Sequence, residues 1–275
     1  MSSPRHVPRK RFGQHFLRDR NVIANMVAAI APQRDGKLLE IGPGEGALTQ
    51  PLLDAGAHLI VVEVDRDLAD GLRQRYAGHP VEVLECDALK LDLITSRASL
   101  FGDEALIRVV GNLPYNISTP LIFHLLDAVD LVQDLHIMVQ KEVAERLAAQ
   151  PGTSAYGRLG VMVGALARVE SLFDVAPGCF FPPPKVRSAV VRITPRPQPL
   201  VPPALRRTFA DLVRHCFSQR RKTLRRSLRA WLNEVDIEAC GVAPDERAER
   251  VDTGQFVALA ARIEARRQVT HKSCG

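Results

Sequence analysis

The stretch KLLEIGPGEG, residues 37–46, joins a short apolar run to three closely spaced glycines. Lys37–Ile41 has the composition of a β-strand, and the glycines lead into Leu48–Ala55, whose pattern is that of an amphipathic helix. Glycines at such a turn let the backbone come close to a ligand at the carboxyl edge of a sheet. The stretch predicts a nucleotide-type site, although a plain strand-to-helix turn would have the same pattern.

The alternation of strands and helices continues outward from this stretch through the first two-thirds of the chain. The expected strands are Lys37–Ile41, His58–Val64, Val81–Glu85, Ile107–Val110, Leu135–Val139 and Ala189–Thr194. The expected helices are Asn21–Ala31, with Asp19 or Asn21 as its cap, then Leu48–Ala55, Leu68–Tyr76, Pro120–Leu126 and Lys141–Ala149. Repeated βα units predict an α/β fold with a doubly wound, mainly parallel sheet.

A proline-rich segment separates this region from the rest of the chain. Pro195–Pro203 contains five prolines in nine residues, which favours a stiff, extended connector. Beyond it, apolar residues such as Phe209, Leu212, Leu224 and Leu228 recur at intervals of three and four. Because 275 residues exceed one typical domain, we expect a catalytic domain over residues 1–200 and a small, all-helical domain over residues 201–275.

Acidic residues follow the second and third strands. Glu63 lies where an acid in such folds binds the hydroxyls of a ribose, and Asp65 is the competing candidate, although its context is that of a helix cap. Asp87 ends the third strand and can accept a hydrogen bond from an adenine amine. A dinucleotide fingerprint would need glycine at position 47, where this chain has Ala47, so a nicotinamide-dependent dehydrogenase is disfavoured.

The tetrapeptide Asn112-Leu113-Pro114-Tyr115 follows the fourth strand. It fits a site that methylates an exocyclic amine, since Asn112 offers a side-chain carbonyl as acceptor. Pro114 leaves the preceding Leu113 extended and a carbonyl free to serve as a second acceptor. Tyr115 offers a flat face for a base. A simple proline turn after a strand is the alternative interpretation.

Composition bounds the remaining choices. The five cysteines form no C-x-x-C pair, the histidines form no evident metal motif, and no apolar run reaches 18 residues. We therefore expect a cytoplasmic, soluble protein with reduced thiols, without metal and without a membrane partner. A sulfonium methyl donor needs no metal, because its methyl group is already activated. The sequence contains no coiled-coil seam, so we expect a monomer.

The net charge of +6 is unevenly distributed. Residues 1–18 contain five Lys or Arg and no acid, and residues 206–229 contain nine against the single acid Asp211. In the second stretch the basic residues recur at helical spacing, opposite Leu224, Leu228, Trp231 and Leu232. The interpretation is a basic helix that contacts phosphates, as a nucleic acid would offer, with a solvated helix face as the alternative. Its proposed RNA-binding residues are Arg220, Arg221, Lys222, Arg225 and Arg226.

Six motifs together resemble those of the small-subunit ribosomal RNA adenine dimethyltransferases, relatives of the macrolide-resistance methylases. The resemblance covers nearly the whole chain. The motifs are Arg11–Leu17 (RFGQHFL), the glycine loop with Leu48-Thr49, Gly111–Ser118 (GNLPYNIS), Tyr156–Leu159 (YGRL), Phe180–Val186 (FFPPPKV) with Ser188–Val190, and Gln219–Thr223 (QRRKT).

The resemblance implies S-adenosylmethionine as donor and, as acceptors, two adjacent adenines near the 3′ end of 16S ribosomal RNA in an immature small subunit. The implied activity is an rRNA adenine N6,N6-dimethyltransferase with a role in ribosome biogenesis. It places His15, Leu17, Gly42, Glu63, Asp87 and Asn112 at the donor, with Gln14, Gly44 and Ala88 nearby. Position 15 departs from the family, which more often has Asn. Tyr115 and Phe180 would stack on opposite faces of a flipped adenine, unless Phe180 is an ordinary core residue.

Two further functions remain open at this point. The chain could be an assembly factor that mainly binds immature subunits, although the intact Glu63, Asp87 and Asn112 argue against a dead site. It could also be a resistance-type methylase that acts on one adenine of the large-subunit RNA. Only the loop Phe180–Val186, here called the proline-rich loop, and the C-terminal helices favour the small-subunit relative.

Overall fold

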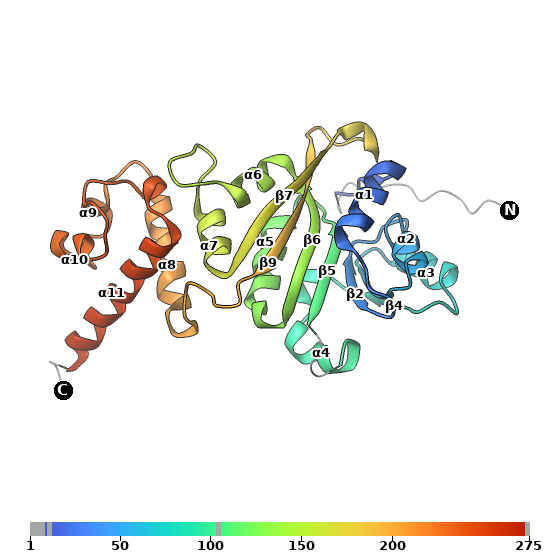
Figure 1. The fold of residues 1–275 in the computed structure, drawn as a ribbon, viewed down its shortest axis with the longest axis horizontal. Helices are drawn as coiled ribbons and strands as arrows, with labels where there is room; N and C mark the ends of the chain where they lie inside the picture. Colours follow the sequence, from blue (N-terminus) through green and yellow to red (C-terminus); the bar gives the residue numbers. More distant parts are fainter. Residues whose placement is uncertain (1–8, 10–12, 103–105, 273–275) are drawn as a thin grey trace. The chain divides into compact units, whose positions relative to one another are not determined.

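The computed structural model describes residue 9, residues 13–102 and residues 106–272 (Figure 1). Arg11, Phe12 and most of the basic N-terminal stretch lie outside these residues. The chain divides into two compact units. The first unit comprises residues 1–144 and 170–195, and the second comprises residues 145–169 and 196–275.

A seven-stranded sheet of order β4-β3-β2-β5-β6-β9-β7 forms the centre of the fold. Its strands are β2 (Lys37–Ile41), β3 (His58–Glu63), β4 (Val81–Glu85), β5 (Ile107–Asn112), β6 (Val132–Gln140), β7 (Ala167–Val175) and β9 (Ser188–Pro195). The neighbours from β4 to β6 run parallel, and β9 pairs antiparallel with β6. The predicted α/β fold with a doubly wound, mainly parallel sheet is therefore confirmed.

Helices accompany the strands of the first unit (Figure 1). They are α1 (Arg20–Ile30), α2 (Thr49–Asp54), α3 (Arg66–Arg75), α4 (Leu93–Leu100), α5 (Ser118–Asp127) and α6 (Lys141–Ala148). Short 3-10 turns span Ala88–Lys90, Val129–Leu131 and Pro177–Cys179. Of the two caps considered for α1, Asp19 is the one observed, since its side chain accepts from the N–H groups of Asn21 and Val22.

A second, two-stranded sheet joins segments that are far apart in sequence. Strand β1 (Phe16–Leu17) pairs antiparallel with β8 (Phe180–Phe181), with Phe16 opposite Phe181 and Leu17 opposite Phe180. The Phe181–Pro182 peptide is cis. The N-terminal segment is thus held against the proline-rich loop.

The second unit is built from helices α7 (Arg158–Leu166), α8 (Arg206–Ser218), α9 (Leu224–Ser227), α10 (Glu234–Glu238) and α11 (Thr253–Lys272), with 3-10 turns Pro203–Leu205 and Ala248–Arg250. The expected boundary after residue 200 needs correction, because the second unit begins at Arg196 and also takes in residues 145–169. The boundaries of the inserted segment pass within α6 and β7.

Packing explains why this inserted segment joins the C-terminal helices. Tyr156 and Val161 belong to the same buried cluster as Phe209 of α8 and Phe256 of α11, and the Tyr156 hydroxyl donates to the carbonyl of Val251 (2.7 Å). Burial of these apolar side chains stabilises the second unit. The proline-rich connector is also bonded here, since its backbone N–H groups at Arg196 and Leu200 donate to Leu166 and Ala165.

The expected basic helix is much shorter than its pattern suggested. Only Leu224–Ser227 is helical, because the N–H groups of Leu224 and Arg225 donate to the carbonyls of Glu246 and Pro244 rather than to a preceding turn. The apolar half of the pattern is nevertheless confirmed. Leu224 and Leu228 are fully buried, and Leu232 is 2% exposed.

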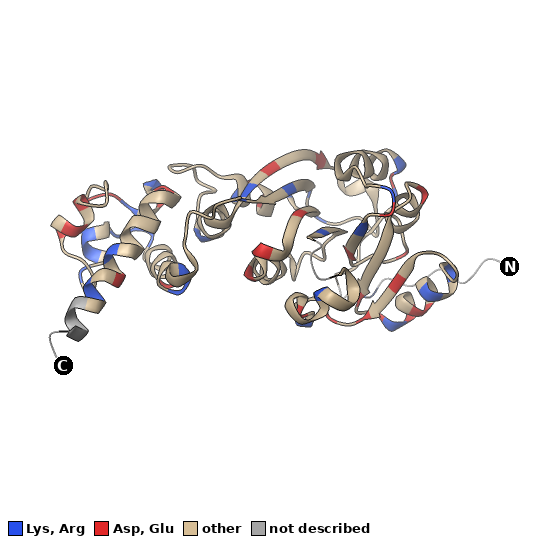
Figure 2. Ribbon diagram, turned by 60° about the horizontal axis from the view of Figure 1, so that its bottom comes forward, with Lys and Arg blue, Asp and Glu red and all other residues tan. Residues whose placement is uncertain are grey.

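Charge is divided unequally between the units. Of the 37 Lys and Arg, 19 lie in the second unit together with only 10 of the 31 Asp and Glu, which gives that unit a formal charge of +9 and the first unit −3. Figure 2 shows Lys and Arg recurring along the helices of the second unit. Such an imbalance favours a polyanionic partner for the second unit.

Candidate functional site

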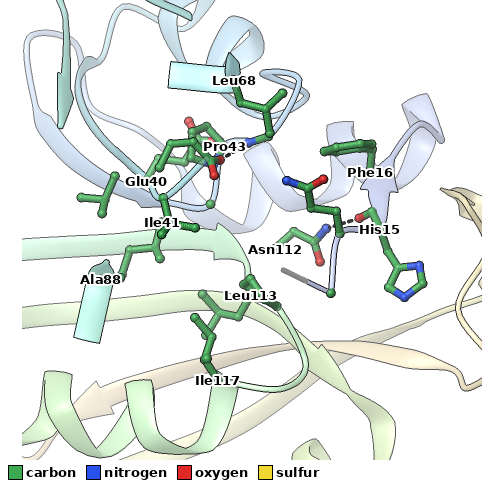
Figure 3. A pocket seen from close by; sticks show the side chains of 18 of the residues that line it. His15, Phe16, Glu40, Ile41, Pro43, Leu68, Ala88, Asn112, Leu113 and Ile117 are labelled. Carbon is green, nitrogen blue, oxygen red and sulfur yellow. Dashed lines mark hydrogen bonds between the residues drawn. The ribbon is translucent and has the colours of Figure 1, made fainter. Parts of the chain in front are cut away.

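A cavity lies at the carboxyl ends of β2, β3, β4 and β5 in the first unit (Figure 3). Every residue that the sequence predicted to bind the donor lines it: Gln14, His15, Leu17, Gly42, Gly44, Glu63, Asp87, Ala88 and Asn112. Leu113, Pro114 and Tyr115 also line it. Residues from four strand ends and from the N-terminal segment therefore meet at one place, as expected for an α/β sheet.

The glycine loop forms one wall of the cavity. Gly42 and Gly44 both adopt positive φ, +67° and +57°, which side-chain-bearing residues rarely take. A Cβ atom on Gly44 would lie 2.9 Å from the ring of Phe16. The absent side chains thus allow β1 to approach the loop and leave backbone exposed to a ligand.

Glu63 lies at the end of β3 and is 5% exposed. One carboxylate oxygen accepts from the N–H of Gly44 (3.1 Å) and the other from the N–H of Asp65 (3.0 Å). Burial raises the pKa of Glu63, and these two hydrogen bonds oppose the rise. The carboxylate is therefore held rigidly beside the glycine loop.

Asp65, the competing candidate, has a structural role instead. Its side chain caps α3 by accepting from the N–H of Asp67, and it forms an ion pair with Arg9 (2.7 Å) and a hydrogen bond with Gln14 (3.0 Å). It does not line the cavity. Of the two acids, Glu63 is the one placed to meet a ligand.

Glu40 is a cavity residue that the sequence reasoning missed. It belongs to β2, is 1% exposed and accepts a hydrogen bond from the Thr49 hydroxyl (2.7 Å). Burial, with a smaller contribution from the nearby Glu63 charge, raises the pKa of Glu40 to about 7. Its position in the sequence could have indicated it, because Glu40 is an acid within the apolar strand Lys37–Ile41, just before the glycine loop.

Asp87 and Ala88 form the wall at the end of β4. One oxygen of the Asp87 carboxylate accepts from the N–H of Leu89 (3.0 Å) and caps the turn Ala88–Lys90. This hydrogen bond orients the carboxylate and leaves its other oxygen as an acceptor at the cavity. Cys86 also lines the cavity, and burial raises the pKa of its thiol.

Asn112 ends β5 with its side chain oriented by the N-terminal segment. Its amide nitrogen donates to the backbone carbonyl of His15 (2.9 Å), the contact marked in Figure 3. Because the nitrogen is engaged in this way, the side-chain oxygen is the polar atom left to accept from a ligand. This orientation agrees with the acceptor role that the sequence predicted.

The next three residues form a tight turn below Asn112. The Leu113 side chain is 1% exposed, and the Pro114 carbonyl accepts from the N–H of Ile117 (3.1 Å). In the part of the chain that the structure describes, no donor reaches the carbonyl of Leu113. The Tyr115 hydroxyl shares a hydrogen bond with the buried Ser188, a partner that no sequence signal indicated.

His15 links the cavity to the proline-rich loop. Its ring stacks on Tyr115, with centroids 5.6 Å apart and an interplanar angle of 28°, and its Nδ1 donates to the carbonyl of Pro182 (2.7 Å). The imidazole thus covers one face of the Tyr115 ring, which the sequence predicted to stack on a base.

Phe180 is not brought to the cavity in this structure. It is 5% exposed and belongs to a buried cluster with Leu17 and Val190, whereas its neighbour Phe181 is 47% exposed beneath the guanidinium of Arg18. The register of β1 with β8 turns one ring inward and the next outward. Phe180 is thus packed as an ordinary core residue, which was the alternative interpretation of the sequence. A stacking role for Phe180 stays a prediction.

The predicted RNA-binding residues lie in the second unit and are all exposed. Arg220 is engaged by Glu249 (2.9 Å) and by the carbonyl of Ser154, and Arg225 is engaged by Asp245 (2.9 Å). Arg221, Lys222 and Arg226 form no ion pair within the described part of the chain. The stretch is therefore only partly neutralised by neighbouring acids.

Within residues 13–102 and 106–272, no cluster of three or more His, Cys, Asp or Glu has an arrangement suited to a metal ion. No helix among these residues is both long and apolar enough to cross a bilayer.

Sequence comparisons give a consistent family match. A family model described as ribosomal RNA adenine dimethylase matches residues 5–265. A protein of Bordetella pertussis named ribosomal RNA small subunit methyltransferase A is 51% identical over 93% of this chain and 94% of its own length. A protein of the same name from Pseudomonas aeruginosa is 50% identical over 94% of this chain and 95% of its own length.

Solved structures extend the match to the fold. A dimethyladenosine transferase from Plasmodium falciparum superposes with a TM-score of 0.77 at 28% identity, covering 91% of this chain and 98% of that one. The 23S rRNA methyltransferase ErmE superposes with a TM-score of 0.70 at 30% identity, covering 90% of this chain and 99% of that one.

Proposed function

Because this chain belongs to the ribosomal RNA adenine dimethylase family, we propose that its substrate is the small-subunit RNA. It is an S-adenosylmethionine-dependent adenine dimethyltransferase, as the resemblance implied. The proposed acceptors are two adjacent adenines near the 3′ end of 16S ribosomal RNA, each dimethylated on its exocyclic amine. The proposed substrate particle is an immature small subunit in the cytoplasm, and the enzyme acts as a monomer in its biogenesis.

The choice of subunit is supported by sequence similarity. Relatives at about 50% identity carry names that refer to the small subunit, whereas the 23S enzyme ErmE is 30% identical. The likeness to ErmE extends over the whole fold. It therefore supports the reaction type without favouring the large-subunit RNA.

The residues of the cavity fit S-adenosylmethionine. Glu63 offers carboxylate oxygens for ribose hydroxyls, Asp87 offers one for the adenine amine, and Gly42 and Gly44 leave room for close approach to the backbone. His15, Leu17 and Asn112 line the same cavity, with Gln14 and Ala88 beside them. These roles are proposals that follow from the placement of each group.

The donor, when bound, supplies a sulfonium methyl group that is already activated. Asn112 would then accept a hydrogen bond from the target amine through its side-chain oxygen, while its nitrogen stays anchored on the His15 carbonyl. The carbonyl of Leu113 would accept a hydrogen bond from the second amine N–H, so that the nitrogen lone pair faces the cavity. Tyr115 stacks on the purine ring. Because the amine must leave its RNA stack, the adenine is flipped or already unpaired.

The single observation that carries the methyl-transfer part of this proposal is the convergence of Glu63, Asp87 and Asn112 on one cavity. The decisive experiment incubates the protein with labelled donor and separated, unmodified ribosomal subunits, then maps each modified nucleotide and counts its methyl groups. We expect two neighbouring dimethyladenines in 16S RNA of the small subunit. Methylation of one large-subunit adenine would overturn the choice of substrate.

Variants of Glu63 test the donor site in the same assay. Glu63→Ala should abolish methyl transfer and leave subunit binding intact, and Glu82→Ala, on the exposed side of β4, is the matched control. Because both oxygens of Glu63 also accept from backbone N–H groups, circular dichroism checks that Glu63→Ala keeps its local fold. Full transfer by Glu63→Ala would refute the assigned role.

A protein whose main work is subunit binding remains the second candidate. The Glu63→Ala variant distinguishes the two, since an assembly factor would support subunit maturation equally well without methyl transfer. The favourable geometry of Asn112 and Glu63 is the observation that favours catalysis.

A further inference from the structure

The second unit contains a groove of about 880 Å³. None of the residues that line the candidate site of the first unit lines this groove. It lies between the segment that follows α9 and the C-terminal part of α11. Its lining residues are Arg225, Arg229, Ala230, Trp231, Leu232, Asn233, Glu234, Ile263, Arg266 and Arg267. We propose that this groove, here called the Arg–Trp groove, binds a single-stranded segment of RNA, an inference that rests on the proposed function.

Four arginines face the Arg–Trp groove against one acid, Glu234. Arg266 is paired with Asp236, and Arg225 lies 2.9 Å from Asp245. The remaining two are less committed. Arg229 is exposed and forms no ion pair within the described residues. Arg267 makes two long contacts, a hydrogen bond donated to the Thr208 hydroxyl (3.3 Å) and an exposed i,i+3 pair with Glu264 (3.7 Å) of the kind that contributes little.

Trp231 gives the groove an aromatic surface. Its ring contacts His215, with centroids 4.7 Å apart, and it packs against the buried cluster of the unit while still lining the groove. The flanking Leu228 and Leu232 are 0% and 2% exposed, so the backbone on either side is anchored. The indole is therefore presented in a fixed position, which limits the entropy lost on binding.

The combination of cations and an indole indicates the kind of partner. Exposed guanidinium groups attract phosphates, and a π-face stacks on any unpaired base, the pairing found in proteins that bind single strands. A duplex keeps its bases stacked and would leave the indole unused. The charge of +9 on this unit favours a polyanion as the partner.

The Arg–Trp groove differs from the stretch that sequence reasoning singled out. Of the residues predicted to bind RNA, only Arg225 lines it. Arg229 closes the basic run in sequence, whereas Arg266 and Arg267 come from α11 and were not foreseen. They join the site because the C-terminal third of α11 lies beside the segment after α9, as the shared lining shows.

Trp231 is the only tryptophan of the chain, so intrinsic fluorescence reports on this groove alone. The full-length protein is titrated with a single-stranded RNA of about 12 nucleotides, and binding is followed by tryptophan emission and by anisotropy of a labelled copy. We expect a saturable change in emission that parallels the anisotropy. Binding seen by anisotropy without any change in emission would overturn the proposal, as would equal binding of a duplex of the same length.

Variants define the contribution of each group. Arg229→Gln with Arg267→Gln should weaken RNA binding and reduce the slope of log K against log salt by about 1.4, the value for two lost contacts to a single strand. Arg214→Gln is the matched control, because Arg214 is an exposed arginine of α8 outside the groove. It should leave both the RNA affinity and the salt slope nearly unchanged. An unchanged slope in the double variant would reject the groove.

The stacking contribution needs separate variants. Trp231→Ala should weaken binding about tenfold, whereas Trp231→Phe, which keeps a flat ring, should recover most of the loss. Circular dichroism checks that each variant folds. Methyl transfer measured on intact subunits separates this proposal from the proposed function: if the groove variants bind RNA normally while subunit methylation persists, only the groove assignment fails.

Discussion

Glu40 and Glu63 show how individual carboxyl groups are placed at this site. Both are buried beside the glycine loop, and both have a raised pKa because burial disfavours their charged forms. Two backbone N–H groups stabilise the charged form of Glu63, whereas only the Thr49 hydroxyl donates a hydrogen bond to Glu40. The two acids therefore differ in how readily they ionise, and Glu40 is the one expected to carry a proton near neutral pH.

Replacing Glu40 with Gln should change how stability depends on pH. The folded-state pKa of about 7 lies above the ordinary value of 4.5, so the contribution of Glu40 to stability is present below pH 4.5 and is lost as the pH rises through 7. A neutral amide has no such dependence. We expect Glu40→Gln to gain up to about 3 kcal/mol relative to the natural protein between pH 4 and pH 8.

Urea denaturation of both proteins across this pH range measures the difference in their free energies of unfolding. Glu82→Gln, on the exposed side of β4, serves as control and should differ from the natural protein by a constant amount. A difference for Glu40→Gln that is independent of pH would contradict the buried, protonated state.

Several residues of the site could be predicted from sequence because they follow strands. Glu63 and Asn112 end β3 and β5, Asp87 lies two residues after β4, and parallel strands bring their carboxyl ends to one edge. Ser188 could not be predicted, since its bond to Tyr115 depends on the long-range pairing of β9 with β6. The inward orientation of Phe180 depends in the same way on the register of β1 with β8.

At the scale of elements, the strongest periodic runs were predicted and the weak ones were not. The five parallel strands match their expected ranges to within three residues at each end. Strand β7 was missed because its composition, ARVESLFDV, is polar enough to be taken for a loop. The basic helix was overestimated because Gln219–Thr223 forms a local turn and a bridge to Arg247, after which the N–H groups of Leu224 and Arg225 donate to distant carbonyls.

Gly111 determines how closely β5 approaches β2. A Cβ atom at this position would lie 2.3 Å from the carbonyl oxygen of Ile41, which is backbone and cannot move aside cheaply. Gly111→Ala should therefore push the strands apart, destabilise the protein by about 1–3 kcal/mol and displace the adjacent Asn112. We expect methyl transfer to be lost even at temperatures where the variant is fully folded.

Val110→Ala is the matched control for this change, since it alters the neighbouring buried residue of the same strand. It leaves a small cavity that costs about 2 kcal/mol without forcing the strands apart. Thermal unfolding and methyl-transfer rates are measured together. Retained transfer in Gly111→Ala would show that the spacing of β2 and β5 does not position Asn112.

At the scale of the whole molecule, the two units carry different kinds of surface. The cavity of the first unit is lined by buried carboxyl groups and by apolar side chains, whereas the second unit carries a charge of +9. The sequence indicated two domains, yet the membership of residues 145–169 could not be predicted. It depends on Tyr156 and Val161 packing with α8 and α11, which no local pattern records.

This division predicts that salt affects the two binding steps differently. Raising the salt concentration from about 50 to 200 mM should weaken subunit binding by an order of magnitude or more, because phosphate contacts release counterions. Donor binding should change little, because its partners are buried and few charges are neutralised. Calorimetry with donor and filter binding with subunits measure both steps. Equal salt dependence would contradict the assignment of RNA contact to the basic unit.

The pairing of Phe16 with Phe181 has a consequence for how the protein is made. The rim that carries Gln14 and His15 is completed by a strand synthesised more than half a chain later, so a nascent polypeptide that ends before that strand lacks the partner of its own N-terminal segment. The pocket of a growing chain therefore cannot be completed until β8 has been synthesised. The enzyme becomes competent only when its own synthesis is well advanced.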